Sequence, residues 1–497
     1  MASAGSSTLE NGVTKAARLA TKGCEAFEAY RHAEAISFLG QAIYLRPNEP
    51  SLYGLRAEAH IQMCDLQSGL ANLRKALKLA ADLEEKLSAA GKAKPDADDA
   101  GPWAEASEAL QATMQSAIGA VSMPSPTGGA ARAAAEAARH AARLARVLDL
   151  RAVTLIEDGA HADAAPLLTE ALALDESVRA LWLHRALART GLEQYEDALS
   201  DLTKCIALDG NDADIHFLRA KLSLLAGSLE GARRAVDTAL RLRPHHADAL
   251  ELQKTMSDCA DVYTDEATKL ILVGSPADAV SNLTHAMALR PDDPSLLMRR
   301  GAARRQQGQL LEAARDLEGA IRLAGGRHPE CQRLLVLTFN DLGVKLASTR
   351  KFSDALGWLH RAVALDETLG PVFLNRGDCH RALGDIDAAL TDFERAAVLF
   401  VGDAKAQWAI QSRIAVVHNE RGAQMFNHAA ARHAAVEFSR AIECNPRVAS
   451  FYVNRAQATL ELKRYDLAKD DVLAALQINP HDEKAKQLLH SLCPGML

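Results

Sequence analysis

Small apolar residues recur along the chain in pairs that are seven positions apart. Seven positions are about two turns of an α-helix, so both members of a pair lie on one helical face. Six of the ten intervals between successive first members are 34 residues, and the others are 47, 42, 45 and 95 residues. The first members are Ala35, Gly69, Ala164, Ala198, Ala232, Ala279, Ala313, Ala355, Ala389, Ala434 and Ala468. The pattern predicts eleven helices that each pack closely against a neighbour.

A further small residue lies twelve positions before each first member and predicts a second helix ahead of the first. These residues are Gly23, Ala57, Ala152, Ala186, Ala220, Ala267, Gly301, Gly343, Gly377, Gly422 and Ala456. Proline, which cannot continue a helix, closes several of the resulting pairs, as at Pro47 and Pro480. The sequence therefore predicts eleven helix–turn–helix repeats.

A helix–turn–helix unit of 34 residues resembles the tetratricopeptide repeat family. The resemblance implies an all-α fold, namely a right-handed α-solenoid in which each repeat buries its apolar face against its neighbours. The intervals of 47, 42 and 45 residues are interpreted as longer first helices in repeats 6, 8 and 10. Residues 482–492 carry an apolar stripe opposite charged positions, which predicts a helix that caps the last repeat.

The interval of 95 residues separates the first two repeats from the other nine. Its composition, rich in charge, glycine and proline around 91–129, is typical of a linker. We therefore expect a disordered N-terminus over 1–14, repeats 1 and 2 over 15–80, and a flexible linker over 81–135. Repeats 3–11 are expected over 136–481, and a capping helix with a tail over 482–497. A short helix could form near 103–120 inside the linker.

Composition and motifs favour a binding protein over an enzyme. The net charge of −7 gives no electrostatic case for binding nucleic acid. No two of the eight cysteines form a Cys-x-x-Cys pair, and no apolar run approaches the roughly 18 residues of a membrane span. The chain also lacks phosphate-binding, nucleophile-elbow and zinc-protease motifs. We expect a cytoplasmic protein without catalytic residues, cofactor, metal, membrane contact or small-molecule substrate.

Arginine precedes the small residue of the first helix in eight of the eleven repeats, as at Arg56 and Arg455. A structural role is expected, with the stem packed across the repeat and the guanidinium near water or a carboxylate. A binding role is predicted for one dense cluster, consisting of Arg299, Arg300, Arg304 and Arg305. An acidic peptide or tail would bind such a cluster through charge-assisted hydrogen bonds.

Other candidate binding residues lie on the first helices of other repeats. Arg381 and Lys221 are the charged candidates, and Phe217, Leu224 and Phe426 are the apolar ones. Charged contacts mainly steer a partner, so the firmer anchorage is expected from the apolar residues.

One branch of the tetratricopeptide repeat family holds acidic chaperone tails with a carboxylate clamp of Lys, Asn and Arg side chains. At two of the asparagine positions this chain has Cys24 and Leu55. Near the C-terminus Asn454 and Lys484 match the clamp, whereas Ala423 and Leu488 do not. These departures from the clamp argue against binding of chaperone tails.

Several segments resemble one member of the family that is associated with ciliated cells; they are residues 55–66, 293–301, 338–342, 375–379 and 492–496. This resemblance implies a structural component of the cilium or flagellum axoneme that docks onto a microtubule-associated assembly. Axonemal proteins, microtubule-associated proteins or tubulin would then be its partners. The alternative is a soluble adaptor or co-chaperone that binds peptides transiently.

Overall fold

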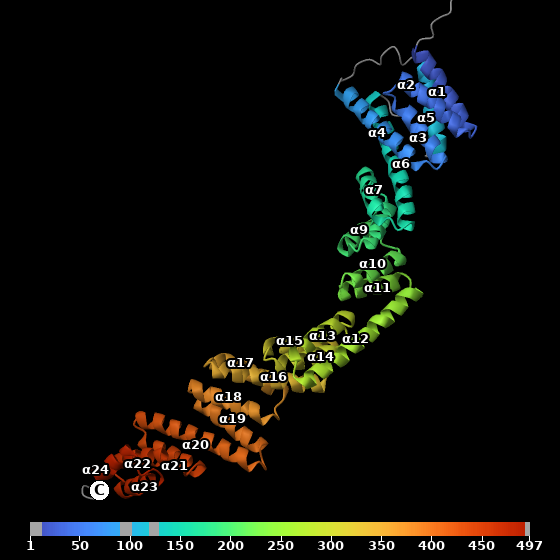
Figure 1. Cartoon of the computed structure of the whole chain (residues 1–497). Coiled ribbons are helices and arrows are strands. Elements are labelled where there is room, and N and C mark those ends of the chain that lie inside the picture. Colours follow the sequence, from blue (N-terminus) through green and yellow to red (C-terminus); the bar gives the residue numbers. More distant parts are fainter. Residues whose placement is uncertain (1–11, 90–101, 119–128, 493–497) are drawn as a thin grey trace, which may run out of the picture. The chain divides into compact units, whose positions relative to one another are not determined.

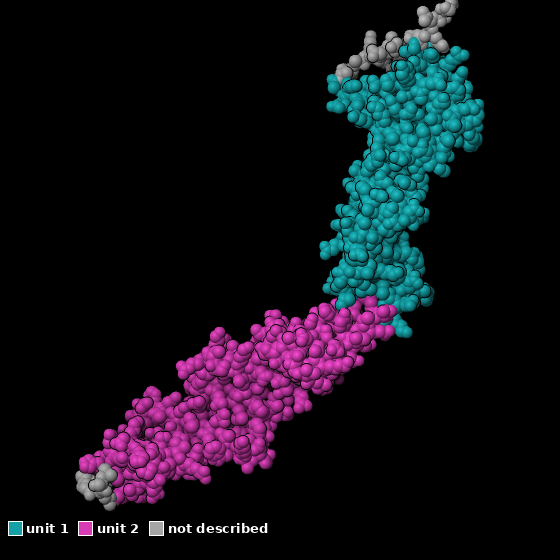
Figure 2. Space-filling view, in the orientation of Figure 1, with its two compact units in different colours: residues 1–254 teal, residues 255–497 magenta. Residues whose placement is uncertain are grey.

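The computed structural model describes residues 12–89, 102–118 and 129–492, which form 24 helices and no strand (Figure 1). The chain divides into two compact units, residues 1–254 and residues 255–497 (Figure 2). We call them the N-terminal and C-terminal units. Each is described by itself, and α12 (Ala247–Val273) runs through the boundary.

The N-terminal unit begins with two helix pairs and an additional helix. The bounds are α1 (Gly12–Glu28), α2 (His32–Leu45), α3 (Pro50–Gln62), α4 (Leu66–Ala89), α5 (Pro102–Ile118), α6 (Gly129–Glu157), α7 (His161–Leu174), α8 (Arg179–Gly191), α9 (Tyr195–Leu208), α10 (Ala213–Leu225) and α11 (Leu229–Leu242). In the repeats before α12, each first helix packs on its own second helix, and α2, α4, α7 and α9 each pack on the first helix of the next repeat.

The C-terminal unit continues the same alternation and ends with a single helix. The bounds are α13 (Pro276–Leu289), α14 (Pro294–Gln306), α15 (Leu310–Leu323), α16 (Pro329–Ser348), α17 (Phe352–Leu365), α18 (Gly370–Leu383), α19 (Ile386–Leu399), α20 (Ala404–Asn427), α21 (Ala431–Cys444), α22 (Ala449–Glu461), α23 (Tyr465–Ile478) and α24 (Glu483–Leu492). The prediction of eleven repeats is confirmed, since α5 and α24 are the only described helices outside the pairs.

The longer intervals arise from longer first helices, as predicted. Most first helices have 13 or 14 residues, whereas α12, α16 and α20 have 27, 20 and 24. In every repeat the small residue lies five or six positions before the first helix ends, as Gly422 does in a helix that ends at Asn427. The extra turns are therefore added at the N-terminal end of the helix.

The two helices of a repeat approach each other closely at the small residue of the first. A Cβ built on Gly343 would lie only 2.6 Å from Leu359 Cγ, and one on Gly377 only 2.7 Å from Phe393 Cε1. Leu359 and Phe393 are fully buried. A larger residue at these glycine positions would push the second helix away, because close-packed cores have little room to yield.

A buried ion pair joins the two helices in four repeats. An arginine of the first helix binds an aspartate 16 residues later, in the second helix, with two hydrogen bonds in each case: Arg185–Asp201, Arg300–Asp316, Arg376–Asp392 and Arg455–Asp471. The four aspartates are buried. In repeat 2 Asn72 replaces the aspartate and accepts from Arg56. In these four repeats the expected structural role of the arginine is met by a carboxylate inside the repeat, and in repeat 2 it is met by an amide oxygen.

The structure differs from the flexible linker expected over 81–135. Helix α4 extends to Ala89, α6 begins at Gly129, and α5 packs against α1 and α3. The physical reason is an apolar stripe on α5, formed by Trp103, Ala106, Leu110 and Met114, all of which are buried. The segments 90–101 and 119–128 lie outside the described residues.

The expected tether between repeats 2 and 3 is likewise replaced by direct packing. Helix α4 lies against α6, and their apolar residues form one buried cluster. Arg143 of α6 binds Glu58 of α3 with two hydrogen bonds of 2.6 and 2.7 Å, and Glu58 is only 1% exposed. Repeats 1–3 therefore form one continuous stack.

The described part of the chain begins with α1 and ends with α24. Residues 12–14, expected to be disordered, belong to α1, while residues 1–11 and 493–497 lie outside the described residues. At the other end, α24 packs on α23 and buries Ala485 and Leu489 in the core of repeat 11. The predicted capping helix is confirmed.

Removing a carboxylate from one of the buried pairs should destabilise its repeat strongly. We expect Asp392→Ala to lower the local unfolding free energy by about 3 kcal/mol, because the Arg376 guanidinium would stay buried without a partner. Glu394→Ala, on the exposed side of the same helix, should change it by less than about 0.5 kcal/mol. Hydrogen exchange of α18 and α19 measures both. Equal effects of the two substitutions would contradict a structural role for the pair.

Two glycines of repeat 8 should respond to alanine with opposite signs. Gly357 has no atom within 4 Å of an added Cβ, so Gly357→Ala should stabilise by about 0.5–1 kcal/mol through helix propensity. Gly343→Ala should destabilise by about 1–3 kcal/mol, because Leu359 must move. Urea unfolding followed by circular dichroism compares them. A stabilising Gly343→Ala would show that the contact between α16 and α17 is loose.

Candidate protein-binding site

First helices of several successive repeats lie side by side, as α1 and α3 and also α6 and α8 do in the N-terminal unit, and the surface they form is what we call the helix A face. In the C-terminal unit α14 contacts α16, α16 contacts α18, and α20 contacts α22. Most of the residues predicted to bind a partner belong to this face, since they come from α14, α18 and α20.

The predicted cluster of four arginines is divided between two environments. Arg300 and Arg304 both bind Asp316 of α15, at 2.7 Å each, and their side chains are only 15% and 21% exposed. They hold α14 on α15 and are not available to a partner. The substitution Arg304→Glu would remove one of the two guanidinium groups that bind Asp316 and would place a second carboxylate beside it.

The other two arginines of the cluster reach across the helix A face. Arg299 is exposed and donates to the Thr268 hydroxyl of α12 at 3.0 Å. Arg305 donates to Asp341 of α16 at 2.7 Å, in a pair of which both members are about one-third exposed. Exposed pairs of this kind are worth about 0–1 kcal/mol, so a carboxylate from a partner could take the place of Asp341.

The charged residues between α18 and α20 form a second pair of bridges. Arg381 donates to Glu420 at 2.9 Å, and Arg413 donates to Asp378 at 3.2 Å. All four side chains are between 36% and 40% exposed. The predicted residue Arg381 therefore lies on an accessible part of the face.

A shallow depression of about 320 Å³ lies beside these bridges. Its lining consists of Asp378, Arg381, Trp408, Ala409, Ser412, Arg413 and Val416. Trp408 is 60% exposed and Val416 is 38% exposed, which is unusual for large apolar side chains. The arrangement offers an aromatic surface flanked by two guanidinium groups.

Sequence reasoning missed Trp408, which lies in the N-terminal extension of α20. A signal was present, because the residues three and four positions away on the same helix are Ala404, Lys405, Gln411 and Ser412. A tryptophan whose helical neighbours are small or polar does not belong to an apolar stripe. It is therefore predicted to face solvent or a partner.

The predicted apolar residues are less exposed than expected. Phe217 packs on the ring of His246 at 5.1 Å between centroids, and Lys221 lies 5.0 Å above the Phe217 ring. Leu224 is half-buried, and Phe426 packs against the cluster around Phe438. Phe217, Lys221 and Leu224 belong to the N-terminal unit, whereas Phe426 and the arginines belong to the C-terminal unit.

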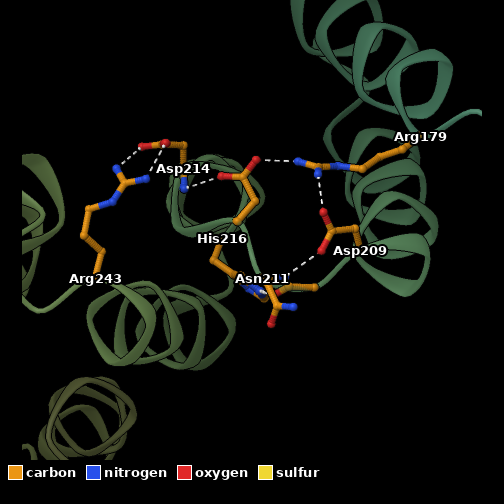
Figure 3. A network of polar contacts seen from close by, with 8 residues as sticks. Arg179, Asp209, Asn211, Asp214, His216 and Arg243 are labelled. Atoms are coloured by element: carbon orange, nitrogen blue, oxygen red, sulfur yellow. Dashed lines mark hydrogen bonds and ion pairs between the residues drawn. The ribbon is translucent and has the colours of Figure 1, made fainter.

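A polar network in the N-terminal unit links the start of α8, the segment around the start of α10 and the residue after α11 (Figure 3). Arg179, at the start of α8, binds Asp209 and Asp212 before α10. Asp214 in turn accepts two hydrogen bonds of 3.0 Å from Arg243, and these hold the pKa of the Asp214 carboxyl below its usual value. Because every charge has an opposite charge beside it, the network fixes neighbouring repeats and offers no reactive group.

Neither a metal site nor a membrane-spanning helix is present in the parts of the chain that the structure describes. Residues 12–89, 102–118 and 129–492 contain no group of three or more His, Cys, Asp or Glu side chains that could hold a metal ion. Among the same residues no helix has both the length and the apolar character needed to cross a bilayer.

Models of the tetratricopeptide repeat match residues 189–254, 371–397 and 449–482. Tetratricopeptide repeat protein 16 of Macaca fascicularis is 26% identical over 481 residues, which are 96% of this chain and 48% of that protein. The chain thus spans about half the length of the curated relatives it matches. DnaJ homolog subfamily C member 7 of Mus musculus is 30% identical over 132 residues, or 26% of this chain and 27% of that protein.

A likeness to solved structures is also present but adds little. The P58(IPK) TPR domain is 19% identical and covers 70% of this chain and 97% of that chain, with a TM-score of 0.25. A score this low carries no weight, so the fold rests on the helices and contacts described above. The eleven helix pairs and the matching repeat models show that the chain contains tetratricopeptide repeats.

Proposed function

We propose that the chain is a non-catalytic scaffold that binds other proteins on the helix A face of its C-terminal unit. The observation that carries this proposal is the depression beside Trp408, where a half-exposed tryptophan lies next to Arg381 and Arg413. Tryptophan and arginine are enriched among the residues that carry most of the binding energy in protein interfaces.

The charges around the depression favour a partner with an acidic segment next to an apolar side chain. Arg381 and Arg413 each hold a carboxylate that is more than one-third exposed. Exposed pairs are weak, so acidic groups of a partner can replace Glu420 or Asp378 at little cost. The apolar side chain would cover the exposed ring of Trp408. Arg299, exposed on α14, would add to the attraction at a distance.

For the cellular setting we propose the axoneme of the cilium or flagellum, reached from the cytoplasm. Support comes from the similarity over nearly the whole chain to tetratricopeptide repeat protein 16, which is the family member associated with ciliated cells that the sequence resembles. Tubulin, or an acidic microtubule-associated or axonemal protein, has the chemistry that the depression favours. The scaffold would dock there as a structural component.

The second candidate is a soluble adaptor or co-chaperone that binds peptides transiently. The match to DnaJ homolog subfamily C member 7 over 132 residues favours it. Against it stand the two clamp positions in repeats 1 and 2, because Cys24 and Leu55 are buried. At the other end Asn454 donates to Asn419 at 2.7 Å, so its amide is already engaged.

Trp408→Ala should weaken docking, whereas truncation of an exposed apolar side chain outside the depression should not. If Trp408 is the anchor, its truncation should cost about 2 kcal/mol, or roughly 30-fold in Kd. The control is Val398→Ala, which shortens a 63% exposed valine of α19 outside the depression. Co-sedimentation with isolated axonemes over a range of protein concentrations gives both affinities.

Two results of this experiment would count against the proposals separately. If Trp408→Ala and Val398→Ala bind axonemes as tightly as the unchanged chain, the depression is not the docking site. If the unchanged chain does not co-sediment with axonemes, the ciliary setting is wrong.

A peptide that ends in an acidic heat-shock chaperone tail should bind no better than its scrambled sequence. The physical reason is the absence of donors at Cys24 and Leu55, which bury apolar side chains where the clamp needs amides. Fluorescence anisotropy with the labelled peptide measures the two affinities. Micromolar binding that depends on the peptide sequence would favour the adaptor.

A further inference from the structure

Helix α5 occupies the helix A face of repeats 1 and 2. It contacts α1 and α3, which are the first helices of those two repeats. Its buried side chains are Trp103, Ala106, Leu110 and Met114, at most 6% exposed. Their spacing of three, four and four positions places them on one helical stripe. The stripe shares a buried cluster with α1, α2 and α3, so the face that is open beside Trp408 is covered here.

Specific contacts hold α5 near each end. The Arg46 guanidinium lies 4.3 Å from the centre of the Trp103 ring, in a cation–π contact. Towards the other end, the Thr113 hydroxyl donates to Glu28 of α1 at 2.8 Å. Met114 approaches the backbone of α3 at Gly54, where an added Cβ would lie 3.0 Å from Met114 Cε. The surface thus matches α5 in shape and in polar partners.

Helix α5 is not part of any repeat. The other helices from α1 to α23 form pairs of a first and a second helix, whereas α5 has no partner helix of its own. Its main contacts are with the first helices α1 and α3. A single amphipathic helix laid across the first helices of a repeat stack is held like a ligand helix in a groove.

We propose that the helix A face of repeats 1 and 2 is a receptor for one amphipathic helix, which α5 fills in cis and thereby closes to other proteins. A competing partner must present a helix with apolar residues at positions i, i+3, i+7 and i+11, including a large aromatic side chain at the first. This inference does not depend on the depression beside Trp408, which lies in the C-terminal unit.

Cys24 reports whether the receptor is occupied. It lies beside Thr113 of α5, is only 4% exposed, and burial raises the pKa of its thiol to about 11. Since the thiolate is the reactive form, alkylation of Cys24 should be slow while α5 is in place. Cys64 and Cys259 are exposed and serve as references within the same chain.

The test compares Leu110→Glu with Gln115→Glu in the full chain. Leu110 is fully buried on the inner side of α5, whereas Gln115 is exposed on the outer side of the same helix, so both substitutions add the same charge in different places. We expect Cys24 of the Leu110→Glu chain to react with iodoacetamide at least about tenfold faster, because local opening exposes the thiol. Gln115→Glu should leave the rate unchanged, and Cys64 should react alike in all chains.

A synthetic peptide of residues 102–118 then tests the receptor itself. Added in excess to the Leu110→Glu chain, it should restore the protection of Cys24, and a scrambled peptide should not. The proposal is overturned if Cys24 stays protected in the Leu110→Glu chain without peptide. It is also overturned if the thiol becomes reactive and the peptide restores nothing. Should Leu110→Glu lower the helical signal beyond the loss of α5, Met114→Ala replaces it under the same two criteria.

Discussion

The close approach of two helices at one small residue is the constraint on which the rest of the structure depends. At Gly377 the second helix comes so near that a single methyl group would collide with Phe393. Each repeat buries its apolar surface through this contact and through its neighbours, since a lone helix pair has too little surface to stay folded. The small residue therefore fixes where the two helices of a repeat meet, while the rest of the repeat can vary in length.

The same constraint decides what charged residues can do. An arginine beside the small residue has its stem packed between two helices, and its head group needs a partner that is also inside. Asp316 and Asp392 meet that need in their repeats, with no more than 5% of either carboxylate exposed. In four repeats the arginine that looks available in the sequence is thus bound inside its own repeat. An arginine that a partner can reach lies about one turn further along the first helix. Arg381 is an example, because its ion pair with Glu420 is open to water.

The repeats could be predicted from the sequence because their signal is local. The spacing of Gly301 to Ala313 is set within one helix pair, so it can be read without knowledge of the fold. The role of α5 could not be read in this way. Its apolar stripe from Trp103 to Met114 is visible, but the surface that accepts it lies on α1 and α3, well before it in the chain.

Arg300 and Arg304 were mistaken for a binding pair for a related reason. Their partner Asp316 is in the printed sequence, yet its burial depends on how α14 and α15 pack.

The position of the extra turns in α12, α16 and α20 has a consequence for how such a chain can change. Because the contact with the second helix lies near the C-terminal end, residues inserted at the N-terminal end do not shift the register of the stack. A repeat can gain a turn there while its neighbours keep their places, and the new turn has one buried side, as at Cys331 and Ile410, and one side open to solvent. Trp408 lies on one such turn. The array can therefore acquire new recognition surface by lengthening, on the outward side of the added turn, where Trp408 is 60% exposed and the packing between helices does not limit side-chain size.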